Sequence, residues 1–133
     1  MNTLTVKAIP KSIEDITDFA NKVLEQHECP KMIIAKIDIV IDEIVSNVCS
    51  YAYQDDKGEL TFEIGISGCS VQLIFKDSGQ PFDPLENPDP NVSIPPSRKK
   101  VGGLGIYMTK KMMDSVEYRF DNGENILTIT KSF

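Results

Sequence analysis

The sequence has few of the residues on which common catalytic and metal sites depend. Histidine occurs once, so a Ser-His or Cys-His nucleophile could use only His27 as its base, and nothing near it supports such a pair. The three cysteines (Cys29, Cys49 and Cys69) are odd in number, far apart and form no CxxC motif. This pattern indicates reduced thiols in a cytoplasmic protein and argues against a zinc site or a disulfide framework.

Long apolar runs and an excess of positive charge are also missing. No apolar run approaches the ~20 residues that span a bilayer, and no signal peptide opens the chain, so we expect no membrane association. Lysine and arginine number 14 against 20 aspartates and glutamates, a net charge of −6. General affinity for nucleic acid is therefore not expected. With 133 residues and 41% hydrophobic content, the chain has the make-up of one globular domain covering 1–133.

Hydrophobic periodicity predicts five strands and three helices. The strands are expected at 3–9, 60–66, 71–75, 116–120 and 126–130, and the helices at 12–26, 30–52 and 106–113. The run from Ser12 to Asp15 resembles a capping box for the first helix. Because parallel βαβ alternation is absent, we expect an α+β two-layer sandwich: a mixed, mainly antiparallel sheet with three helices on one face.

The regular pattern breaks between residues 77 and 102. Six of the eight prolines lie in this stretch. A loop of this length inside a compact domain is more often functional than idle.

A carboxylate and a carboxamide share one face of the expected second helix. Glu43 and Asn47 are four residues apart, so both side chains project from the same side, beside an apolar seam. Alone, this pair is also compatible with a solvated helix edge. Asp38 and Asp42 lie about 100° away around the helix, and we expect them to face solvent.

The segment Asp77-Ser-Gly-Gln-Pro-Phe82 follows a strongly apolar strand. A plain turn would explain Asp, Ser and Gly. In the functional interpretation, Asp77 accepts a hydrogen bond from an exocyclic amine, and Gly79 lets a flat ring approach the backbone. A carboxylate acceptor selects adenine, because guanine presents a carbonyl at the corresponding position.

The segment Gly102-Gly-Leu-Gly-Ile106 opens the last helix. Unencumbered N–H groups at a helix N-terminus suit phosphate binding, whereas the alternative is a flexible hinge before a helix. Neither a Walker A sequence nor a GxGxxG following a strand is present. Three consecutive cations precede it (Arg98, Lys99 and Lys100), which could reach a terminal phosphate or form a solvated charge run.

The order and spacing of these three motifs resemble the nucleotide-binding boxes of the GHKL ATPase superfamily, which has the Bergerat fold. The runs Ile41-Asp-Glu-Ile-Val-Ser-Asn47, GGLGI and Asn125-Ile-Leu-Thr-Ile-Thr-Lys131 are similar to those of the anti-sigma-factor serine kinases. The resemblance covers residues 12–131. It implies a serine/threonine kinase that binds a sigma factor and phosphorylates a STAS-type anti-anti-sigma protein, with a homodimer usual among relatives.

The resemblance also implies ATP and Mg²⁺ as cofactors, with an ATP lid at about 83–101. Glu43 is then the base, Asn47 the Mg²⁺ ligand, and Asp77 with Gly79 the adenine site. The implied phosphate-binding residues are Gly103, Leu104, Gly105 and Ile106 through their N–H groups, together with Arg98 and Lys100 from the lid. Asn125 stands where relatives often carry a threonine at the adenine site, and Tyr51 where many carry a histidine.

Two other functions remain open on the sequence. One is a non-catalytic, ATP-dependent interaction module. The other is the ATPase domain of a histidine kinase, which is weakened by the lack of a dimerisation helix with a phospho-acceptor histidine.

Overall fold

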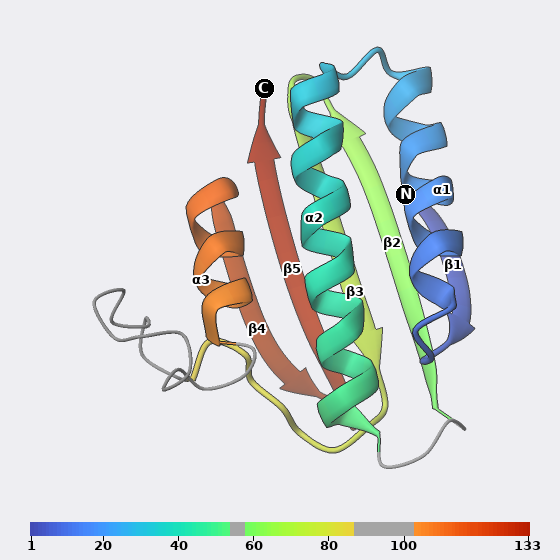
Figure 1. Cartoon of the computed structure of the whole chain (residues 1–133), viewed down its shortest axis with the longest axis vertical. Helices are drawn as coiled ribbons and strands as arrows, with labels where there is room; N and C mark the ends of the chain where they lie inside the picture. The colour runs from blue at the N-terminus through green and yellow to red at the C-terminus, as the bar shows by residue number, and fades with distance from the viewer. Residues whose placement is uncertain (54–57, 87–102) are drawn as a thin grey trace.

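The computed structural model describes residues 1–53, 58–86 and 103–133 (Figure 1). The elements in chain order are β1 (Asn2–Lys7), α1 (Ser12–Gln26), α2 (Lys31–Asn47), η1 (Val48–Ala52), β2 (Glu59–Ser67), β3 (Ser70–Asp77), α3 (Gly103–Met112), β4 (Ser115–Asp121) and β5 (Glu124–Ser132). All five strands and all three helices that the periodicity predicts are present; α1 has the predicted bounds, and the ends of the other elements are shifted by one to five residues.

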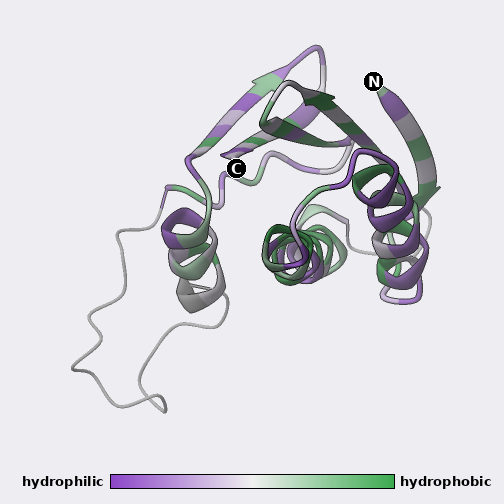
Figure 2. Cartoon of the chain, turned by 90° about the horizontal axis from the view of Figure 1, so that it is seen from above, coloured by the Kyte–Doolittle hydropathy of each residue, from purple (hydrophilic) through white to green (hydrophobic). Residues whose placement is uncertain are grey.

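The strands form one sheet in the order β1-β2-β3-β5-β4, and each neighbouring pair is antiparallel. Side chains alternate between the two faces of a strand, so one face of the sheet carries the apolar set. The three helices cover that face (Figure 2). The predicted α+β two-layer sandwich is therefore confirmed.

The core forms between this face and the helices. Phe62 of β2 and Phe75 of β3 are paired in the register, and their ring centroids lie 5.2 Å apart. Both are buried, as are Ile16 of α1 and Ile37 and Ile41 of α2. The predicted helical stripes thus meet the predicted strand face, and the apolar area removed from water stabilises the fold.

The start of α1 differs from the sequence prediction. Lys11 occupies the N-cap position without a side-chain hydrogen bond, and Ser12 is already helical and buried. The backbone N–H of Ser12 instead donates to the carbonyl oxygen of Ile9 at 3.0 Å. The capping box is therefore wrong, because a preceding turn of backbone takes up the hydrogen bond that a cap would have supplied.

The second helix is also not continuous to Ala52, as its apolar spacing predicts. The α-helix ends at Asn47, and a π-helical turn, η1, follows. Such wide turns are rare and occur often at functional sites. Apolar periodicity cannot reveal this change, because the contacts that hold η1 come from the segment after β3.

The sequence predicts that Asp38 faces solvent, but its side chain is half-buried. Its Oδ1 atom is buried without a hydrogen-bond partner, and so is Oδ1 of Asn21 on α1. Burial raises the pKa of Asp38, the hydrogen bond with Asn21 lowers it in part, and Asp18 raises it further. The prediction fails because α1 packs beside this part of α2, whereas Asp42, one turn further on, is exposed as expected.

The described part of the long 77–102 stretch contains no helix or strand after Asp77. The helix that follows begins at Gly103, three residues earlier than predicted. Among the described residues, no helix has the length and apolarity needed to cross a membrane.

Candidate functional site

Asp77 is the last residue of β3 and points to the helix side of the sheet. It is only 6% exposed. Its Oδ1 atom accepts hydrogen bonds from the backbone N–H of Gly79 and from Nδ2 of Asn125, each at 2.9 Å. The strand register explains the second contact, because Asp77 and Asn125 are directly opposed on β3 and β5.

Burial raises the pKa of Asp77 above its ordinary value of 3.8. The hydrogen bonds from Asn125 and Gly79 favour the carboxylate and offset part of this shift, whereas nearby Glu124 adds to it. Among the described residues, the donors to this carboxylate all bond Oδ1. Oδ2 is thus the oxygen that Asp77 can offer to a ligand.

A small cavity lies next to Asp77, between the end of α2 and the sheet. Its volume is about 30 Å³, room for about two water molecules. Its lining is Ile44, Asn47, Val48, Ala52, Phe75, Asp77, Phe82, Pro84, Tyr118, Asn125 and Leu127. A carboxylate among mainly apolar walls fits an aromatic base that carries an amine. A purine ring is larger than this cavity, and Phe82 and Pro84, which follow β3, form part of the wall that limits it.

The segment after β3 is hydrogen-bonded to η1, the turn that follows α2. Gln80 donates from its backbone N–H to the carbonyl of Ala52 at 2.8 Å and from Nε2 to that of Tyr51 at 2.7 Å. A Cβ on Gly79 would collide with the backbone of Ala52, so only glycine permits this approach. The Tyr51 ring stacks on Phe82, with centroids 4.9 Å apart. The segment 77–82 is therefore in direct contact with η1, the turn that follows Asn47.

Tyr53 supports the same segment from the other side. Its hydroxyl accepts a hydrogen bond from the backbone N–H of Ser78 and donates to the carbonyl oxygen of Glu59, both at 2.8 Å. The path of the chain beyond Asp77 is consequently fixed by contacts from η1 and from the residue that follows it.

Glu43 and Asn47 lie together on α2, as the i, i+4 spacing predicts. Asn47 is 8% exposed and lines the cavity, and its side chain is hydrogen-bonded to Glu43. The Oε1 atom of Glu43 is buried and has no hydrogen-bond partner in the described structure. Burial raises the pKa of Glu43, and Asp42 adds to the rise. An unpaired buried carboxyl oxygen is costly unless a ligand supplies the missing donor.

This cost gives a pH-dependent expectation for stability. A raised pKa means that the folded protein binds the Glu43 proton more tightly than the unfolded chain, so stability falls as the pH rises above about 4.5, the ordinary value. We expect Glu43→Gln to be more stable than wild type at pH 7 by about 1 kcal/mol, with no difference below pH ~4. Urea denaturation across this range measures it, with Glu117→Gln, an exposed position on β4, as control. A Gln variant less stable at pH 7 would contradict it.

The first turn of α3 lies directly on Glu43. A Cβ on Gly105 would coincide with the carboxyl group of Glu43. Thr109, which is buried, donates from Oγ1 to the carbonyl oxygen of Gly105 at 3.0 Å. The structure therefore brings the N-terminus of α3, including the predicted residues Gly105 and Ile106, next to the predicted base.

Gly105→Ala is expected to destabilise the protein by about 1–3 kcal/mol. The added methyl would displace the carboxyl group of Glu43 from its hydrogen bond with Asn47, and this loss outweighs the better helix propensity of alanine. Chemical denaturation measures the loss. Gly65→Ala on β2 is the control, because its methyl would meet only the movable side chain of Met1. Equal stability of Gly105→Ala and wild type would show that α3 does not rest on Glu43.

Metal binding here would depend on few protein ligands. In the described part of the chain, no group of three or more His, Cys, Asp or Glu side chains is placed to hold a metal ion. The amide oxygen of Asn47, beside a carboxylate, is a hard donor that fits Mg²⁺ when phosphate oxygens and water complete the shell. The residues present are thus compatible with the magnesium that the resemblance implies.

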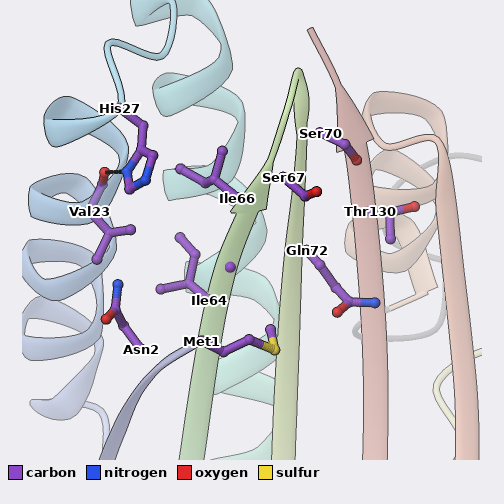
Figure 3. Close-up of a pocket in the computed structure, with 11 residues that line it drawn as sticks. Met1, Asn2, Val23, His27, Ile64, Ile66, Ser67, Ser70, Gln72 and Thr130 are labelled. Atoms are coloured by element: carbon purple, nitrogen blue, oxygen red, sulfur yellow. Dashed lines mark hydrogen bonds between the residues drawn. The ribbon is translucent and has the colours of Figure 1, made fainter.

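A second cavity, of about 620 Å³, lies at the other end of the sheet, around the start of β3 (Figure 3). It is lined by uncharged polar groups such as Ser70 and Gln72, and by His27. The Nδ1 atom of His27 is 2.9 Å from the carbonyl oxygen of Val23, a contact internal to the end of α1. None of the described residues that line this cavity is a lysine or an arginine, the side chains that best bind a polyphosphate.

Several predicted site residues cannot be placed. Arg98, Lys99 and Lys100, and most of the expected lid at 83–101, lie outside the described residues, whereas Gly103 and Leu104 form the start of α3. Sequence reasoning, in turn, missed Gln80 and Tyr118. Gln80 lies inside the DSGQPF segment, and Tyr118 is at an inward-facing position of its strand. Both positions could therefore have been identified in the sequence as candidates.

With this geometry in view, comparison with known proteins identifies the family. Residues 6–131 match the histidine kinase-like ATPase domain, and the chain belongs to this family. The predicted GHKL resemblance is confirmed.

The chain is 27% identical over 103 residues to the serine-protein kinase RsbW of Bacillus cereus, and 26% identical over 98 residues to that of Bacillus thuringiensis. Both matches cover 71% of this chain and 61% of the relative, so the chain spans less than two thirds of these relatives.

Solved structures show the same fold. The RsbU and RsbW domains of Rv1364c from Mycobacterium tuberculosis superpose with a TM-score of 0.66 at 18% identity, covering 99% of this chain and 32% of that one. The histidine kinase domain of EL346 from Erythrobacter litoralis superposes with a TM-score of 0.58 at 11% identity, covering 96% of this chain and 61% of that one.

Proposed function

We propose that this chain is an ATP-dependent serine/threonine protein kinase of the anti-sigma type, forming one domain over 1–133. The observation that carries the proposal is the buried, unpartnered Oε1 of Glu43 beside Asn47 and the first turn of α3. A carboxylate that has one oxygen without a donor, at a helix N-terminus suited to phosphate, is arranged to take a proton from a hydroxyl group.

The nucleotide would lie between the Asp77 cavity and α3. Asp77 accepts a hydrogen bond from the adenine amine through Oδ2, and Gly79 keeps the backbone close to the ring. Asn47 gives its amide oxygen to Mg²⁺, which neutralises phosphate charge when bound. The phosphate oxygens are held by the N–H groups of Gly103, Leu104, Gly105 and Ile106 and by lid cations, among them Arg98 and Lys100.

Glu43 then acts on the partner hydroxyl. It takes the hydroxyl proton while the hydroxyl oxygen bonds to the γ-phosphorus, and the bond to the bridging oxygen of ADP breaks. The raised pKa of Glu43 brings it nearer the operating pH, which favours a general base.

We propose that the chain binds a sigma factor, phosphorylates a serine of a STAS-type protein, and works as a homodimer in the cytoplasm. The support is the resemblance of the motifs to those of the anti-sigma-factor serine kinases, together with the similarity to serine-protein kinase RsbW.

Calorimetric titration tests nucleotide binding first. We expect Mg-ATP to bind in preference to Mg-GTP, and ATP with EDTA to bind more weakly. No binding by folded, nucleotide-free protein would overturn the proposal. Incubation with γ-labelled ATP and candidate STAS proteins then tests transfer. Acid-stable phosphoserine is expected; binding without transfer would indicate an interaction module, and acid-labile phosphohistidine a histidine kinase domain.

A further inference from the structure

Tyr118 reaches the candidate base site from β4, the edge strand. It lies opposite Leu127 in the register, faces the helix layer and lines the cavity next to Asp77. Its hydroxyl donates a hydrogen bond to Oδ1 of Asn125. Burial raises the pKa of Tyr118, so the phenol keeps the proton that it donates.

The carboxamide of Asn125 has a full set of hydrogen bonds. Its Oδ1 accepts from the Tyr118 hydroxyl and from the backbone N–H of Phe82, the latter at 3.0 Å. Its Nδ2 donates to Oδ1 of Asp77 and to the carbonyl oxygen of Gln80, both at 2.9 Å. An amide group can form two bonds at each end, so the orientation of this side chain is fixed.

This fixed orientation determines what Asp77 can offer. The N–H groups of Asn125 and Gly79 occupy both lone pairs of the Asp77 Oδ1 atom. A third strong donor can bond only Oδ2. The chain of contacts from Tyr118 through Asn125 therefore sets which carboxylate oxygen meets a base, and at which angle.

We propose that Tyr118 is a positioning residue that determines base selectivity, acting through Asn125 on Asp77. This inference rests on the proposed ATP binding and deepens it. Adenine gains from a well-oriented Asp77, because its exocyclic amine donates to the carboxylate. Hypoxanthine has a carbonyl at that position and gains nothing, so Tyr118 raises affinity for one base only.

Tyr118→Phe tests the inference, because it removes one oxygen and keeps the ring that lines the cavity. We expect the affinity for Mg-ATP to fall about two- to tenfold, the value of one neutral hydrogen bond, while the affinity for Mg-ITP stays unchanged. Calorimetry with both nucleotides gives the ratio of the ATP affinity to the ITP affinity. Tyr107→Phe is the matched control: it lies on α3, with its ring 5.4 Å from Nζ of Lys111. Its ATP/ITP ratio should equal that of wild type.

Equal losses for ATP and ITP in Tyr118→Phe, or no loss for either, would overturn the inference, since a purely structural role affects both nucleotides alike. A double-mutant cycle gives a second reading: in an Asp77→Asn background, Tyr118→Phe should no longer change the ratio. A persisting change there would show that Tyr118 does not act through Asp77. If wild-type protein binds neither nucleotide, the proposed function itself fails, and this inference fails with it.

Discussion

Glu43→Gln is expected to reduce phosphoryl transfer to a partner serine by about 10²- to 10⁴-fold and to leave the affinity for Mg-ATP within about twofold of wild type. A general base matters in the transition state, where the hydroxyl proton is transferred, and little in the ground state. The glutamine keeps the shape of the side chain and can still bond to Asn47, but it cannot accept a proton. Single-turnover transfer assays and calorimetry measure the two quantities separately.

Asp42→Asn is the matched control for this experiment. Asp42 is the neighbouring carboxylate on α2 and is exposed, so its loss removes a nearby charge that raises the pKa of Glu43 but removes no side chain from the site. We expect normal transfer from this variant. Should ATP affinity and transfer fall together in Glu43→Gln, the carboxylate would have a structural role instead.

Asp77→Asn is expected to lower ATP affinity about ten- to over a hundredfold, the value of one charge-assisted hydrogen bond. The environment dictates how the new amide lies. Gly79 and Asn125 both donate to position Oδ1, so the single amide oxygen must remain there, and the NH₂ group replaces Oδ2. That NH₂ then faces the adenine amine, donor against donor.

The same argument predicts the change in base preference. An amide N–H can donate to the carbonyl of a 6-oxo purine, so Asp77→Asn should bind GTP and ITP relatively better than wild type does. Calorimetry with ATP, GTP and ITP tests this, with Asp121→Asn at the end of β4 as control. Unchanged ATP affinity in Asp77→Asn would remove the basis for placing adenine beside this residue.

The fold could be predicted closely from the sequence, because the hydrophobic patterns that specify each helix and strand lie within that element. Alternating apolar residues mark β2 and β3, and helical stripes mark α1 and α2; each pattern has one burial solution in two layers. The errors occur where distant segments intervene. The π-helical turn depends on Gln80, and the position of Asp38 depends on α1, so neither follows from the periodicity of α2 alone.

For the candidate site, the sequence predicted which elements lie together, and the roles of their residues stay predictions. Glu43, Asn47 and Asp77 stand in motifs of fixed spacing, and the structure brings their elements together around one cavity and the end of α3. Tyr118 belongs to no such motif. Its contact with Asn125 depends on the pairing of β4 with β5 and on the direction of one hydroxyl group, which a residue pattern does not encode.

The attachment of Gln80 to Tyr51 and Ala52 has a mechanical consequence. The segment after β3 is linked by two hydrogen bonds to η1, the π-helical turn that directly follows the helix carrying Glu43 and Asn47. Under the proposed ATP binding, a base that displaces this segment would also strain these two hydrogen bonds. The filling of the base cavity would then affect η1, which directly follows Asn47.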